Sequence, residues 1–100
     1  MTRAIRFSPE AIADIARMYD YIAPRGGERI AAAYIARIYQ YCLDLEPFPE
    51  RGTRRDDIWQ GLRLVGFERH ATIAFEVTPD EVRIVRVFGR GQDVEGELGE

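Results

Sequence analysis

The chain has 100 residues, which is the length of one domain, and its 46% hydrophobic and 31% charged residues indicate a folded chain rather than a disordered one. No apolar run approaches the ~20 residues that cross a bilayer, and the N-terminus lacks the apolar segment of a signal peptide. The single cysteine, Cys42, excludes an internal disulfide. These features predict a cytoplasmic protein that does not enter a membrane.

Charge is unevenly distributed along the chain. All 14 basic residues are arginines, and 17 acidic residues bring the formal net charge to −3. The charged residues that follow Gly91 are all acidic: Asp93, Glu95, Glu97 and Glu100. We therefore predict a single domain over residues 1–92 and a flexible acidic tail over residues 93–100. A nearly neutral body with an acidic tail argues against direct, sequence-specific nucleic-acid binding by this chain alone.

The N-terminal half predicts a strand followed by two helices. Residues 3–7 alternate between apolar and polar positions, as in a strand. Ser8 and Pro9 are typical of a helix start, and the helix is expected to end near Pro24. Its apolar stripe comprises Ala11, Ile15, Met18 and Ile22. A glycine turn separates it from a second amphipathic helix over residues 28–45, so the two helices should form an antiparallel hairpin.

The C-terminal half predicts three strands. A polar connection spans residues 50–60, and strand-like runs cover residues 62–67, 71–77 and 82–88. The sequence thus predicts an α+β fold with the order β-α-α-β-β-β, in which the helical hairpin packs on one face of a small antiparallel sheet. The opposite face should be partly open, and a partner or substrate could lie there.

Arg86 is the most informative residue of the last strand. Strict alternation places it on the same face as Val82, Ile84 and Phe88. An arginine among apolar neighbours needs either a carboxylate partner or an anionic ligand. We weigh equally a salt bridge across the sheet, to Glu76 or Glu68, and a functional contact.

Other residues of chemical interest have plainer explanations. His70 is the only histidine and falls in a turn, where a surface position is the usual one. One histidine and one cysteine are too few ligands for a zinc site, and no glycine-rich phosphate loop is present. We therefore expect neither a metal nor a cofactor.

Several motifs together resemble the RelE/ParE toxin superfamily. Ser8-Pro9-Glu10-Ala11, followed by Asp14-Ile15, Met18 and Tyr21-Ile22, is similar to the family's first helix. Pro49 and Gly52 resemble the loop after the second helix. Gly61-Leu62-Arg63, then Ile73, Phe75 and Val77, then Val82, Ile84-Val85-Arg86-Val87 and Gly89-Arg90, resemble the three closing strands. The resemblance covers residues 3–93.

The resemblance implies the toxin of a type II toxin–antitoxin pair. ParE-like members inhibit DNA gyrase and are neutralised by a ParD-like antitoxin, whereas RelE-like members are ribosome-dependent mRNA endonucleases. The absence of lysine, and of any tyrosine after Tyr41, favours the ParE branch, because RNA cleavage needs proton-transferring groups beside cations. We expect no catalytic residues, and the mRNA endonuclease is the alternative.

Two sets of candidate binding residues follow. The residues assigned to target binding or activity are Arg63, Arg86 and Arg90. The residues assigned to antitoxin binding are Tyr19, Tyr34, Trp59 and Arg83. The antitoxin's C-terminal segment would fold onto the exposed parts of the helical hairpin and the sheet edge.

Overall fold

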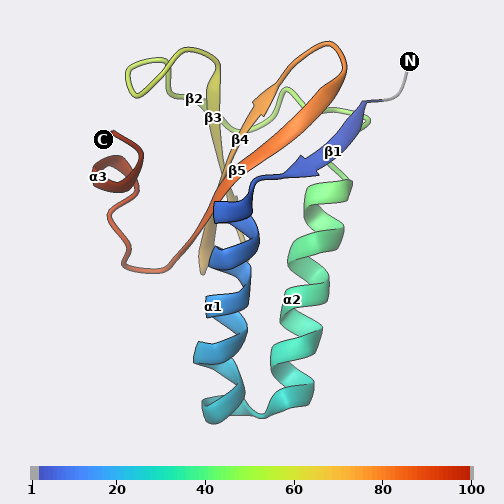
Figure 1. Ribbon diagram of the computed structural model, residues 1–100, viewed down its shortest axis with the longest axis vertical. Coiled ribbons are helices and arrows are strands. Elements are labelled where there is room, and N and C mark those ends of the chain that lie inside the picture. Colours follow the sequence, from blue (N-terminus) through green and yellow to red (C-terminus); the bar gives the residue numbers. More distant parts are fainter. Residues whose placement is uncertain (1–2, 100) are drawn as a thin grey trace.

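The computed structural model describes residues 3–99, which form a helical hairpin, a five-stranded sheet and a short C-terminal helix (Figure 1). The elements are β1 (Ala4–Phe7), α1 (Pro9–Gly26), α2 (Glu28–Leu43), β2 (Thr53–Arg54), β3 (Leu62–Phe67), β4 (Ala71–Val77), β5 (Glu81–Gly89) and α3 (Val94–Leu98). The predicted α+β fold is confirmed, and the expected bounds of β3 and β4 match those observed. Strand β2 and helix α3 are additions.

The sheet has the strand order β1-β5-β4-β3-β2. The pairs β4–β5, β3–β4 and β2–β3 are antiparallel, whereas β1 pairs with β5 in parallel, so the sheet is mixed. The long connection from β1 to β5, which passes through α1, α2 and three strands, allows the parallel pairing that a tight turn does not. Strand β2 lies in the connection expected to be irregular. There Gly52, at φ +75°, lies so close to β3 that an added Cβ would meet the backbone oxygen of Leu64.

Ser8 fixes the junction between β1 and α1. Its Oγ accepts a hydrogen bond from the backbone N–H of Ala11 at 2.9 Å, which caps the helix as predicted. The same hydroxyl donates to the carbonyl oxygen of Val85 at 2.7 Å. One side chain therefore starts α1 and attaches it to the middle of β5.

The main core lies between the hairpin and one face of the sheet. Cys42 and Phe75 are completely buried in it. The other buried members are Ala11, Ile15, Ile38, Leu45, Phe67, Ala71, Ile73, Val82, Ile84 and Val87. This is the packing expected from the apolar stripes of the two helices.

A second, smaller core covers part of the other sheet face. It comprises Leu62, Ala74, Phe88 and Leu98, with Ile58, Trp59, Leu64, Val85 and Val94 packed around them. The acidic stretch from residue 93, which composition assigned to a flexible tail, thus contains α3, and Leu98 is only 6% exposed. The acidic composition suggests a flexible tail, but Val94 and Leu98 are four residues apart and lie on one face of a helix.

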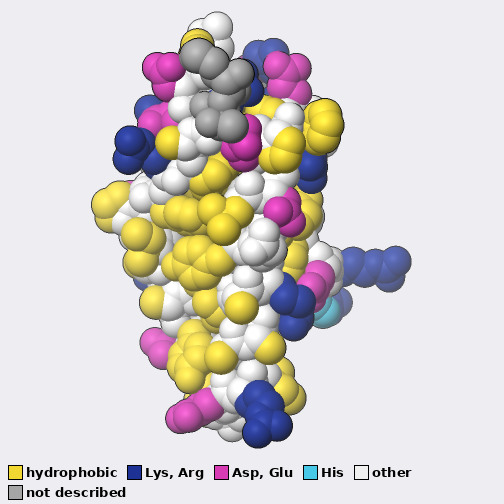
Figure 2. Space-filling model, turned by 90° about the vertical axis from the view of Figure 1, so that its right-hand side faces the viewer, with side chains coloured by type: hydrophobic (Ala, Val, Ile, Leu, Met, Phe, Trp, Pro, Cys, Tyr) yellow, Lys and Arg dark blue, Asp and Glu magenta, His cyan; other side chains and the backbone are white. Residues whose placement is uncertain are grey.

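The hairpin is longer than the sheet it covers. The buried residues of the 18-residue α1 are Ala11, Asp14 and Ile15, all in its first half. The joined ends of α1 and α2 extend beyond the strands (Figure 1). From the α2 side, hydrophobic side chains form a band along most of the molecule (Figure 2). The apolar stripe of α1 therefore continues into a region that no strand covers.

Candidate groove between the hairpin and the end of the sheet

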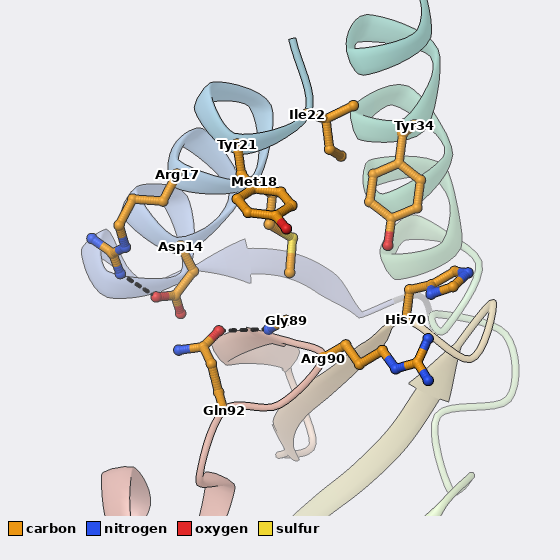
Figure 3. A pocket seen from close by; sticks show the side chains of 10 residues that line it. All are labelled: Asp14, Arg17, Met18, Tyr21, Ile22, Tyr34, His70, Gly89, Arg90 and Gln92. Atoms are coloured by element: carbon orange, nitrogen blue, oxygen red, sulfur yellow. Dashed lines mark hydrogen bonds and ion pairs between the residues drawn. The ribbon is translucent and has the colours of Figure 1, made fainter. Parts of the chain in front are cut away.

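A groove with a volume of about 680 Å³ opens where the hairpin extends past the sheet (Figure 3). Helix α1 forms one wall and α2 contributes to a second, while the β3–β4 turn and the segment after β5 close the third side. Its lining residues are Asp14, Arg17, Met18, Tyr21, Ile22, Tyr34, His70, Gly89, Arg90 and Gln92. The groove thus combines apolar and cationic side chains.

The apolar wall comes from the second half of α1. Met18, Tyr21 and Ile22 line the groove, and Tyr21 is 63% exposed. The guanidinium carbon of Arg25 lies 3.8 Å from the centre of the Tyr21 ring, which supports the ring from one side. A large, exposed aromatic ring held in place beside other apolar side chains is typical of a protein-binding surface.

The β3–β4 turn presents His70 to the groove. Glu68 and Arg69 adopt left-handed backbone angles, with φ of 48° and 62°, which are unfavourable for residues with a Cβ. Arg37 of α2 donates to both carboxylate oxygens of Glu68, at 2.8 and 3.1 Å. These hydrogen bonds lower the pKa of Glu68 and fasten the strained turn to α2.

Tyr34 lies beside this turn. Its ring packs against Phe67, with centroids 5.8 Å apart. Burial, reinforced by the negative charge of Glu68, raises the pKa of Tyr34 above its ordinary value. The phenol therefore stays protonated near neutral pH, which suits hydrogen bonding and not the role of a general base.

Asp14 joins the groove to the sheet. Its two oxygens accept hydrogen bonds from Arg86 at 2.7 and 3.0 Å, and Oδ2 also accepts from the backbone N–H of Val87 at 2.9 Å. Arg17 donates to the same carboxylate from the solvent side. The Asp14 side chain is 2% exposed and that of Arg86 is 17% exposed, so this ion pair is largely shielded from water.

The partner of Arg86 corrects the prediction from strand alternation. Neither Glu76 nor Glu68 pairs with it; Asp14 does, and Glu97 lies 3.5 Å away. The register of β4 and β5 shifts between Ala74 and Phe75, which pair with Arg86 and Ile84 respectively. The extra residue, Val85, reverses the alternation, so Arg86 and Phe88 do not share a face with Ile84.

The model of the ParE toxin of type II toxin–antitoxin systems, parDE, matches residues 5–94. The chain belongs to this family. It is 26% identical over 99 residues to Toxin ParE3 of Caulobacter vibrioides, covering 99% of this chain and 97% of that protein. In fold it is similar to a chain of the chromosomal ParDE system from P. aeruginosa, with a TM-score of 0.76 and 23% identity over 87% of this chain and 95% of that one.

In this ParE-family chain the three arginines assigned to target binding are dispersed. Arg63 lies on β3 and donates to the carbonyl oxygen of Arg51 at 3.3 Å. Arg86 is held by Asp14, and these hydrogen bonds raise the pKa of Arg86 above its ordinary value. Arg90 follows β5, is exposed, lines the groove and makes no side-chain hydrogen bond or ion pair within residues 3–99. Of the three, only Arg90 has a charge that is both accessible and unengaged among the described residues.

The four residues assigned to antitoxin binding also fall in separate places. Tyr34 lines the groove, while Tyr19 is half-buried on α1 outside its lining. Trp59 and Arg83 converge on one carboxylate on the sheet: Trp59 Nε1 donates to Glu76 at 3.0 Å, and Arg83 Nη1 donates to its other oxygen at 3.1 Å. Arg83 also pairs with Glu81 at 2.7 Å.

Sequence reasoning did not identify Met18, Tyr21 and Ile22 as a groove wall. It placed Met18 and Ile22 in the stripe that packs on the sheet, and Met18 does contact the main core as well as the groove. Helix length alone carried no such signal, because the 18 residues of α1 rise about 27 Å and the nine residues of β5 span about 30 Å. Within residues 3–99, no group of three or more His, Cys, Asp or Glu side chains is arranged to hold a metal ion. None of the helices described is long and apolar enough to span a membrane.

Proposed function

We propose that this ParE-family toxin inhibits DNA gyrase by binding it, and that a ParD-like antitoxin neutralises the toxin by folding a segment into the groove. The observation that supports this most directly is the groove itself. There the exposed Tyr21 and the half-buried Met18 and Ile22 lie in the same groove as Arg90, a cation unengaged within residues 3–99. A protein segment with apolar and acidic side chains matches both features. The related Caulobacter and Pseudomonas proteins are, respectively, a ParE toxin and a chain of a ParDE system.

A binding role accords with the chemistry of the groove. Tyr34 has a raised pKa, and Asp14 is engaged by two arginines and a backbone N–H. Neither group is disposed to accept a proton from a substrate. Arg90 instead offers a fixed positive charge that an acidic partner segment could neutralise.

Copurification of the toxin with its antitoxin tests the groove. Tyr21→Asp introduces a charge at an exposed groove residue and should weaken antitoxin binding at least 30-fold, in the range of a lost interface anchor. Ile12→Asp is the matched control, because Ile12 is 50% exposed on the same helix but does not line the groove. Equal loss of binding in both variants, or in neither, would contradict the proposed docking site.

The alternative, a ribosome-dependent mRNA endonuclease, has one observation in its favour. The groove gathers His70, Arg90 and Tyr34, which together offer a titratable group, a cation and a hydroxyl. His70 is the better residue to test, because it is exposed and its loss should leave the fold intact, whereas Arg86 is built into the core ion pair. Cleavage of mRNA on translating ribosomes that disappears in His70→Ala would favour the endonuclease.

A further inference from the structure

Helix α3 packs on the sheet face opposite the hairpin. The surface beneath it, called the seat below, consists of Leu62, Ala74 and Phe88 with the residues packed around them. Leu98 is 6% exposed and packs in a cluster with Leu62, Phe88 and, around them, Trp59. Val94, one turn earlier, contacts the same cluster. In Figure 1 the helix lies apart from the hairpin, beside the outer part of the sheet. The apolar cluster of the seat shares no residue with the lining of the groove.

Two arginines of the body flank this apolar surface. Arg55 Nη2 lies 2.7 Å from Glu95, and Arg86 Nη2 lies 3.5 Å from Glu97. The arginine side chains are 24% and 17% exposed, whereas the glutamates of α3 are 70% and 42% exposed. The two arginines are therefore part of the seat, and the two glutamates of α3 lie on the side that faces solvent.

Each arginine has a second carboxylate that keeps it in place without α3. Arg55 donates to both oxygens of Asp57, at 2.9 and 2.8 Å, and Arg86 donates to both oxygens of Asp14. Both guanidinium groups would therefore hold their positions if α3 left. The apolar cluster and its two cations form a preorganised site for an acidic segment.

Helix α3 has little intrinsic stability. It has five residues, includes Gly96 and is followed by Gly99 as its C-cap. A helix of this length does not persist alone in water, so its contacts with the seat keep it folded. Its two ion pairs are largely solvent-screened on the acid side, which limits their contribution. Residues 90–93 connect it to β5 without regular structure.

We propose that the surface beneath α3 is a second docking surface, specific for an acidic amphipathic segment of a partner protein, and that α3 occupies it in the free chain. Helix α3 shows the chemistry that the seat accepts: apolar side chains four residues apart, as in Val94 and Leu98, with glutamates between them. A partner segment of this kind competes with α3 for the same cluster and the same arginines. The surface adjoins the groove, because Arg86 also bonds Asp14 of the groove lining and Gln92 of that lining donates to Glu97 at 3.5 Å. The proposal does not depend on the identity of the toxin's target.

Binding of a labelled peptide to the full-length chain tests the proposal. The probe is a fluorescent synthetic peptide with the sequence of residues 91–99, and the readouts are its anisotropy and the emission of Trp59, the single tryptophan, which packs in the seat. Leu98→Ala loosens α3 and should raise the affinity for the probe at least fivefold. Leu43→Ala, at a half-exposed leucine of α2 outside the seat, should leave the affinity unchanged.

A second pair of variants tests the electrostatic part. Adding Arg55→Gln to Leu98→Ala should remove most of the gained affinity, whereas adding Arg29→Gln, at an exposed arginine remote from the seat in sequence, should not. Unchanged affinity in Leu98→Ala would overturn the proposal. Loss of the folded state in Leu98→Ala would overturn it too, because α3 would then be an obligatory part of the core.

Discussion

Arg86 Nε and Nη2 lie 2.7 and 3.0 Å from the two carboxylate oxygens of Asp14, so one ion pair joins strand β5 to helix α1. The same carboxylate accepts the backbone N–H of Val87, which lies beyond the last residue paired with β1. Asp14 therefore substitutes for a neighbouring strand at this edge. The arginine that stands out in the sequence thus bridges β5 and α1, and its partner Asp14 also lines the groove.

Replacing Asp14 tests this structural role. Asp14→Ala leaves Arg86 with only Glu97, at 3.5 Å, and leaves the Val87 N–H without its acceptor. It should lower the free energy of unfolding by about 3 kcal/mol. Arg17→Ala is the control, because Arg17 bonds the same carboxylate but is 64% exposed. Its cost should stay below about 1 kcal/mol. Urea denaturation measures both, and similar costs would argue against a shielded Asp14–Arg86 pair.

Ser8 is expected to stabilise two elements at once. Ser8→Ala removes the cap of α1 and the hydrogen bond to Val85, and should reduce stability by about 1–2 kcal/mol. Ser8→Thr keeps the hydroxyl and should recover most of this loss. Thermal unfolding compares the three proteins, and a threonine variant as unstable as the alanine variant would contradict the assignment.

The strained β3–β4 turn predicts a stabilising substitution. Arg69 has φ 62°, so Arg69→Gly relieves a left-handed conformation, while Arg69→Ala removes the same charge and keeps the strain. The glycine variant should be more stable than the alanine variant by about 1 kcal/mol. Chemical denaturation decides, and a more stable alanine variant would show that the turn carries no such strain.

Cys42 should make stability fall at alkaline pH. Burial raises the pKa of its thiol from 9.0 to about 12 in the folded chain. Because the folded pKa is raised, this contribution is complete below the unfolded pKa and is lost as pH rises from about 9 towards 12. Between pH 8 and 10.5 the wild type should lose about 1–2 kcal/mol more than Cys42→Ala loses. Parallel pH profiles of the two proteins would contradict this.

The sequence predicts those features of the structure that are determined by residues close together in the chain. Strand-like runs located β3 and β4, and Ser8-Pro9 located the start of α1, because strand propensity and caps are set by neighbouring residues. The partner of Arg86 escaped prediction because a single extra residue, Val85, reverses the pattern and pairing alone reveals it.

The groove and α3 escaped prediction for a related reason. Whether Ile22 faces a core or a groove depends on how far the sheet reaches beneath α1, which no local pattern records. Leu98 lies among acids and glycines that suggest a flexible tail. It is buried by a cluster that includes Leu62 of β3 and Phe88 of β5. Tertiary context outweighs composition at both places.

The most direct test of the proposed function is a supercoiling assay with purified DNA gyrase. The chain should inhibit supercoiling and cause cleaved DNA to accumulate, and a copurifying ParD-like antitoxin should restore activity. Arg90→Ala should weaken inhibition while leaving stability unchanged, because Arg90 is exposed and unengaged within residues 3–99. Full gyrase activity at saturating toxin, together with mRNA cleavage on translating ribosomes, would contradict the account.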